Sequence, residues 1–199
     1  AQTGRPGPVV VDVPKDIQFA TGTYTPPSAA IQQKSYTPKV QGDLNAIHAA
    51  IELMSKARRP VFYTGGGVVN SGPEATRLLR ELVELTGFPI TSTLMGLGSY
   101  PASGDKWLGM LGMHGSYEAN MTMHDCDVMV CIGARFDDRI TGRLNAFSPN
   151  SKKIHIDIDP SSINKNVRVD VPIIGDVGRV LEDMVRLWRA LPAKPEKAQ

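Results

Sequence analysis

The sequence predicts an α/β fold: a doubly wound parallel sheet of six strands with helices on both faces. Between residues 43 and 190, short apolar runs alternate with segments whose apolar residues recur at helical spacing. Val128–Ile132 is apolar at every position, as expected of a strand covered on both faces. Sheets of this kind bind ligands beyond the carboxyl ends of their strands, so those ends are the expected location of a site.

The N-terminal residues differ from the rest in composition. Val9–Val13 predicts a strand with no preceding strand to pair with, and residues 22–39 are rich in Thr, Pro and Ser, which is typical of a linker. We therefore expect residues 1–21 to be the remnant of a preceding domain, 22–39 a linker, 40–190 the main domain and 191–199 a frayed tail. The chain does not begin with Met, which favours a processed product or an excised piece.

Spacing and end residues predict the elements of the main domain. Asp43 can cap a first helix, and Ser71-Gly72-Pro73-Glu74 has capping-box spacing before a second. Residues 100–115 are expected to be irregular, 117–124 to form a short helix and 177–188 to form the last one. Five strands can be located, at Pro60–Tyr63, Phe88–Ser92, Val128–Ile132, Ile154–Ile158 and Val171–Ile174.

Composition argues against several classes of protein. A net charge of +2 is too small to imply nucleic acid or an anionic membrane as partner, and 6% aromatic residues do not suit a base-stacking platform. Cys126 and Cys131 are the only cysteines, which favours reduced thiols and a cytoplasmic protein. The four histidines share no metal-ligand spacing, and no Ser-His-Asp spacing or paired catalytic carboxylates can be recognised.

Five predicted strand ends carry glycine or small polar residues: Gly65-Gly66-Gly67, Thr93, Gly133, Asp159 and Gly175-Asp176. Glycines there let a backbone approach a phosphate closely, but they can equally close tight turns, and spacing does not decide between the two. The predicted sheet is Rossmann-like, yet the G-x-G-x-x-G fingerprint is absent, which argues against an ordinary NAD-dependent dehydrogenase.

Charged side chains near these ends allow two interpretations. Arg135 and Arg139 could bind a pyrophosphate with their forked donors, or pair with Asp137 and Asp138 at the surface, and charge alone slightly favours the ion pairs. Asp159 and Asp176 are better explained as helix caps, whereas Asp157 could accept a hydrogen bond from a ribose hydroxyl. The glycine- and methionine-rich loop at 109–115, with His114, could lie along a flat ligand.

Several stretches together resemble one family, the catalytic subunits of acetohydroxyacid synthase (acetolactate synthase), which are thiamine-diphosphate enzymes. They are GRPGPVVVDVPKDIQ, TGGGVVNSG, TLMGLGSYP, LGMLGMHGSYEANM, IGARFDDRITGR, IHIDIDPSSINKN and PIIGD. The resemblance covers essentially the whole chain. It implies the central domain of that enzyme, which binds FAD in an extended form as a mainly structural cofactor.

The resemblance also assigns residues. Those expected to line the FAD are Arg5, Gly65, Gly66, Gly67, Thr93, Leu94, Met95, Gly112, Met113, His114, Gly133, Arg135, Asp137, Arg139, Asp157, Ile158, Gly175 and Asp176. Lys15, Asp138 and Arg139 are similar to residues at the mouth of the family's substrate channel. No catalytic residue and no metal ligand is assigned, because the family's activating glutamate and its Mg²⁺ motif belong to domains that flank this one.

The resemblance implies that the complete protein condenses two pyruvate molecules, or pyruvate with 2-oxobutyrate, releasing carbon dioxide on the route to branched-chain amino acids. It would use thiamine diphosphate, Mg²⁺ and FAD as a cytoplasmic (or, in a eukaryote, organellar) homodimer or homotetramer with a small regulatory subunit. The 199-residue chain alone is expected to be inactive and to bind FAD weakly or not at all. The alternatives are a stand-alone flavin- or adenine-nucleotide-binding module, or another carboligase such as glyoxylate carboligase.

Overall fold

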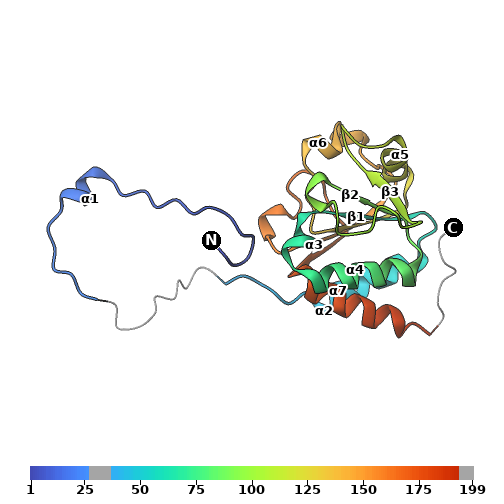
Figure 1. The fold of residues 1–199 in the computed structure, drawn as a ribbon, viewed down its shortest axis with the longest axis horizontal. Coiled ribbons are helices and arrows are strands. Elements are labelled where there is room, and N and C mark those ends of the chain that lie inside the picture. The colour runs from blue at the N-terminus through green and yellow to red at the C-terminus, as the bar shows by residue number, and fades with distance from the viewer. Residues whose placement is uncertain (27–36, 193–199) are drawn as a thin grey trace.

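The computed structural model describes residues 1–26 and 37–192. The middle of the predicted linker and almost all of the predicted tail therefore lie outside the described residues. Residues 41–192 form an α/β body, while the described N-terminal segment runs outside it, with the short helix α1 (Lys15–Phe19) far from the sheet (Figure 1). Within the N-terminal segment, Arg5 reaches the body, where it approaches Asp159.

The body is built on one six-stranded sheet in which every pairing is parallel, so the predicted fold class is confirmed. Its strand order is β3-β2-β1-β4-β5-β6, the order typical of Rossmann-like sheets. Central strands β1 and β4 pair along their length, from Pro60 opposite Val128 to Thr64 opposite Ile132. The strands are β1 (Pro60–Thr64), β2 (Ile90–Ser92), β3 (Trp107–Met110), β4 (Val128–Ile132), β5 (Lys152–Asp157) and β6 (Val171–Ile174).

Helices cover both faces of the sheet (Figure 1). One face is covered by α2 (Leu44–Lys56), α4 (Pro73–Thr86) and α7 (Val177–Arg189), and the other by α5 (Tyr117–Asp125) with the loops that follow β4 and β5. The predicted caps at Asp43 and Asp176 are confirmed, because each carboxylate accepts a hydrogen bond from an amide of the first turn. The short helices are α3 (Gly66–Asn70), α6 (Asp138–Thr141), η1 (Leu94–Gly96), η2 (Leu144–Ala146) and η3 (Pro160–Ser162).

Strand side chains divide between two buried clusters. Phe62, Val130 and Ile154 point to the α2–α4–α7 face, where Trp188 completes the core. The residues next to them in the strands point the other way, and that second cluster includes Tyr63, Met129 and Cys131 together with Ala119, Met123 and Phe136. Because both faces are buried, every residue of β1 and β4 is buried, which explains the continuous apolar run of β4.

Three sequence expectations were wrong. Trp107–Met110 forms edge strand β3 inside the stretch expected to be irregular; its residues are only half-buried, and Gly109 has φ +92°, so its apolar signal is weak. Val9–Val13 forms no strand: Val10 is 89% exposed, and no strand of the described residues pairs with it. The capping box does not form, because the Ser71 hydroxyl donates to Asp176 and Gly72 is the N-cap of α4.

Candidate ligand-binding cleft

A cleft of ≈ 570 Å³ lies at the carboxyl ends of β1 and β4. This is the point where the strand order reverses, so that the loops after the two strands diverge and leave room for a ligand. Many residues singled out from the sequence line it: Arg5, Gly66, Gly67, Thr93, Leu94, Met95, Gly133, Arg135, Asp137, Asp138, Arg139 and Asp157. The predicted residues from five separate stretches of the chain are therefore brought together.

The glycines at this switch point allow two backbones to meet. A Cβ on Gly65 would lie 2.5 Å from the carbonyl oxygen of Gly133, and one on Gly67 would lie 2.6 Å from the Gly133 Cα. Gly133 itself has φ +58°, a backbone conformation that favours glycine. The Gly67 N–H donates a hydrogen bond of 2.9 Å to the Gly133 carbonyl. Gly65 and Gly67 thus join the two loops, whereas Gly66 has its nearest contact at the exposed Met95 side chain and faces the cleft.

The turn after β4 presents alternate residues to the core and to the cleft. Ala134 and Phe136 are buried, and the Phe136 ring packs against His155 (5.2 Å between centroids) and Tyr63 (5.8 Å). Arg135 and Asp137 line the cleft and form an ion pair with 2.8 Å between nitrogen and oxygen. The surface pairing considered from the sequence is therefore present, but it lies in the cleft wall.

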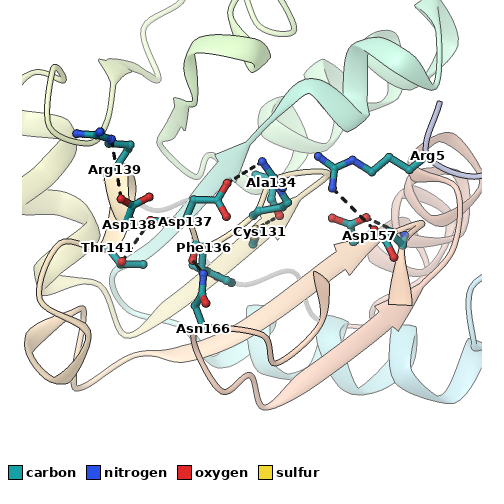
Figure 2. A network of polar contacts seen from close by, with 12 residues as sticks. Arg5, Cys131, Ala134, Phe136, Asp137, Asp138, Arg139, Thr141, Asp157 and Asn166 are labelled. Carbon is teal, nitrogen blue, oxygen red and sulfur yellow. Dashed lines mark hydrogen bonds and ion pairs between the residues drawn. The ribbon is translucent and has the colours of Figure 1, made fainter. Parts of the chain in front are cut away.

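A second and looser pair lies at the rim. Arg139 approaches Asp138 at 3.9 Å, and both side chains are largely exposed (Figure 2). The loop of Gly112, Met113 and His114 packs beside them: the Met113 amide donates to the Arg139 carbonyl, and the Arg139 guanidinium donates to the Met113 sulfur at 3.8 Å. This loop adjoins the cleft rather than lining it.

Asp157, at the end of β5, is the buried carboxylate of the cleft. Its Oδ1 accepts the Asp159 amide over 2.9 Å, while burial raises its pKa by disfavouring the charged form. Arg5 reaches this end of β5 and lies 3.8 Å from the Asp159 carboxylate (Figure 2). A carboxylate held by one backbone amide keeps acceptor capacity for a ligand hydroxyl.

His155 supports the cleft from inside the sheet. Its Nε2 lies 2.8 Å from the Ala134 carbonyl, which can only accept, so Nε2 carries a proton. Burial lowers the pKa of His155 and keeps it neutral. The 3.8 Å approach of Nε2 to Asp157 is consequently not an ion pair at neutral pH.

Other predicted residues lie outside the cleft. Gly65 sits behind it, and Ile158 follows β5 without lining it. Gly175 packs against Gly42, and Asp176 caps α7 while accepting from Ser71, so both have structural roles at the end of β6. Lys15 belongs to α1, outside the body (Figure 1).

Some residues that line or support the cleft were not predicted from the sequence. Val69 and Asn70 line the cleft from α3, a short helix that was not predicted because it begins within the triple glycine. Ala134 and Ile140 also line the cleft, but in the turn after β4 only the charged residues were considered. Tyr63 and His155 were regarded as strand interior, yet their polar atoms reach that turn. The sequence signal that could have identified them is a polar group, the Tyr63 hydroxyl or the His155 ring, in an otherwise apolar strand.

Two further findings concern the described residues as a whole. No helix within 1–26 and 37–192 is long and apolar enough to cross a membrane. In the same ranges, no group of three or more His, Cys, Asp or Glu side chains is arranged to hold a metal ion. The chemistry of the described site thus rests on arginines, one buried carboxylate, backbone groups and apolar side chains.

The strand order and the switch-point cleft define a doubly wound α/β domain of the type that binds nucleotides. The family model described as "Thiamine pyrophosphate enzyme, central domain" matches residues 47–184, and the chain belongs to this family. The match covers the α/β body from α2 into α7.

Relatives named as acetolactate synthase large subunits match nearly the whole chain. The chain is 48% identical over 189 residues to the acetolactate synthase isozyme 3 large subunit of Escherichia coli, covering 94% of the chain and 32% of the relative. It is 47% identical over 192 residues to the acetolactate synthase large subunit of Buchnera aphidicola (95% and 33%). A probable acetolactate synthase large subunit of Methanocaldococcus jannaschii is 44% identical over 199 residues (99% and 33%). The chain spans about a third of the length of these relatives.

Proposed function

We propose that this chain is the FAD-binding central domain of an acetolactate synthase large subunit. The observation that carries the proposal is the similarity of nearly the entire chain to such subunits from bacteria and an archaeon. The family match to residues 47–184 is consistent with it. The switch-point cleft supplies a place for the cofactor on this domain.

Different residues of the cleft suit different parts of a flavin dinucleotide. Arg135 and Arg139 provide forked donors for the pyrophosphate, and Gly66 leaves space for its close approach. The Asp157 carboxylate would accept a ribose hydroxyl. Leu94 and Met95, which are 68% and 74% exposed, would cover an aromatic ring, as would the neighbouring Met113 loop. When bound, the flavin would serve as a structural element of the site.

The same exposure explains why the isolated chain would hold FAD weakly. Apolar contact contributes about 25 cal/mol for each Å² removed from water, and an open cleft covers only one side of a ligand. Further chain placed over Leu94 and Met95 would bury the second side. Lys15, Asp138 and Arg139 would then lie near the entrance for substrate, with Lys15 brought in from the N-terminal segment.

For the complete protein we propose the condensation of two pyruvate molecules, or of pyruvate with 2-oxobutyrate, with loss of carbon dioxide. The chain spans about a third of the length of its relatives, and the family's activating glutamate and Mg²⁺ motif belong to flanking domains, so other parts of the protein would hold thiamine diphosphate and Mg²⁺. The relatives are named as large subunits, which supports a small regulatory subunit as partner. We place the protein in the cytoplasm, as a homodimer or homotetramer.

The direct test is acetolactate formation from pyruvate by the intact protein that carries this sequence, assayed with thiamine diphosphate, Mg²⁺ and FAD. We expect activity that depends on all three, and none from residues 1–199 alone. An intact protein that makes no acetolactate under these conditions contradicts the proposal.

A stand-alone module that binds a flavin or adenine nucleotide is the second candidate. It is favoured by one observation: the described residues contain a nucleotide-type sheet with a cleft at its switch point. The genomic reading frame separates the two candidates. A frame that continues past both ends of this chain excludes the module, and one that stops at both ends excludes the synthase.

A further inference from the structure

Three successive carbonyl groups of the turn after β4 are each bound by a side chain from elsewhere. The Ala134 carbonyl accepts from His155 Nε2 (2.8 Å) and from the Cys131 thiol (3.2 Å). Its neighbours accept from the Tyr63 hydroxyl at the Arg135 carbonyl (2.6 Å) and from the Asn166 amide at the Phe136 carbonyl (2.8 Å). We call Tyr63, Cys131, His155 and Asn166 the carbonyl clamp; Figure 2 shows its Cys131 and Asn166 ends.

The clamp draws on the strands that meet at the switch point. Tyr63 comes from β1, Cys131 from β4 and His155 from β5, while Asn166 comes from the loop that follows β5. The three strand residues are fully buried. Their positions are therefore fixed by the sheet, and their hydrogen bonds tie the turn to three strands, β1, β4 and β5.

Buried donors of this kind are in the protonation state that donation requires. Burial raises the pKa of the Tyr63 hydroxyl and of the Cys131 thiol, so both retain their protons. The neutral His155 ring has its proton on Nε2. Removing the Tyr63 hydroxyl or the Asn166 amide leaves a part-buried carbonyl without its side-chain partner, so the turn loses a constraint and can shift.

The consequence for the cleft follows from the alternation of the turn. Fixing the carbonyls of residues 134–136, with Phe136 anchored in the core, leaves the side chains of Arg135 and Asp137 directed at the cleft. We propose that Tyr63, His155 and Asn166 are positioning residues for anion binding: they hold the turn so that Arg135 meets the pyrophosphate of a bound dinucleotide. This rests on the proposed FAD site and adds residues that do not themselves touch the ligand.

Tyr63→Phe tests the inference, because it removes one hydroxyl and keeps the ring in the core. Tyr100→Phe is the matched control, since Tyr100 is also buried but is not among the residues lining the cleft. Amide exchange is followed at Ile140 and Thr141, whose N–H groups donate to the Asp137 carbonyl. FAD dissociation constants are measured by equilibrium dialysis on the intact protein that carries this sequence.

We expect Tyr63→Phe to speed exchange at these two amides about tenfold and to raise the Kd for FAD about tenfold, with Tyr100→Phe within twofold of wild type in both. Asn166→Ala, a change at the surface end of the clamp, is expected to act in the same direction. Unchanged exchange in both clamp variants overturns the inference. Faster exchange with an unchanged Kd also overturns it, since the clamp would then be structural only.

Inorganic pyrophosphate is the second ligand probe, and it separates the failure of this inference from the failure of the proposed function. If the wild-type protein binds pyrophosphate but not FAD, the flavin proposal is wrong and the Kd for pyrophosphate in Tyr63→Phe decides the positioning role. If it binds neither, both are wrong.

Discussion

Replacing Gly67 with alanine should separate the loops after β1 and β4. The new Cβ would lie 2.6 Å from the Gly133 Cα and 2.9 Å from its carbonyl oxygen, and both are backbone atoms that cannot rotate away. The clash forces the loops apart and breaks the hydrogen bond from the Gly67 amide to the Gly133 carbonyl. The free energy of unfolding is expected to fall, and the cleft to lose its shape.

The size of the effect can be estimated from its two parts. Overpacking a well-filled site costs about 1–3 kcal/mol, and a lost backbone hydrogen bond adds about 1 kcal/mol. The free energy of unfolding should therefore fall by about 2–4 kcal/mol. With an m-value of about 2 kcal/mol per M, the urea midpoint falls by about 1–2 M, measured by circular dichroism.

Gly66→Ala is the matched control within the same triplet. Its Cβ would lie 3.2 Å from the Met95 Cβ and 3.4 Å from the Met95 carbonyl oxygen, contacts that a shift of a few tenths of an ångström relieves, so we expect a loss of only about 0.5 kcal/mol. Equal losses in the two variants, or a Gly67→Ala protein as stable as wild type, would refute the argument that backbone approach selects glycine at residue 67.

Two further predictions concern charge. Asp137→Asn releases Arg135 from its ion pair, and because exposed pairs are worth about 0.2–1 kcal/mol, inorganic pyrophosphate should bind about 1.4- to 5-fold more tightly by calorimetry. Burial lowers the pKa of His155 below its ordinary value of 6.5, so the unfolded chain takes up a proton before the folded one and stability falls as pH drops below 6.5. Burial raises the pKa of Asp157, which acts in the opposite direction, so the effect is read as the difference between wild type and His155→Gln. We expect the wild-type slope to exceed that of His155→Gln by up to about 1.4 kcal/mol per pH unit in urea titrations from pH 7 to pH 5.

Each of these has a control on the same surface type or residue type. Asp138→Asn removes a carboxylate that is 87% exposed and 3.9 Å from Arg139, and it should tighten pyrophosphate binding less than Asp137→Asn does. His124→Gln alters an exposed histidine and should leave the pH slope as in wild type. Equal effects of the two carboxylate changes, or a slope that survives in His155→Gln, would contradict the respective accounts.

The strands of the sheet interior were predictable because burial on both faces selects a continuous run of apolar residues. Val128–Ile132 is β4 at the predicted bounds, since each of its residues contacts a core. Edge strand β3 was not predictable in the same way, because its four residues are half-buried and one is glycine. Ser71 could not be assigned locally, since its partner Asp176 is 105 residues away in sequence.

The cleft was predictable as a set of strand ends but not as a geometry. Gly65, Gly67 and Gly133 were predicted as site residues, yet their close approach depends on β1 lying next to β4. The order of strands in a sheet cannot be predicted from the residues of any one strand. The same adjacency brings Tyr63 and His155 to the turn after β4. Their polar atoms reach the carbonyls of that turn only because three strands from distant parts of the chain lie side by side.

Photolabelling of the intact protein with 8-azido-FAD, mapped by peptide mass spectrometry, tests the location of the site most directly. If FAD lies in the switch-point cleft, the label should appear in residues 65–70, 93–97 or 133–140, and excess FAD should suppress it. Another groove, at the amino ends of the strands, is lined by residues 58–60, 105, 106 and 108 among others. FAD-suppressible label there, with the switch-point segments unlabelled, would contradict the account.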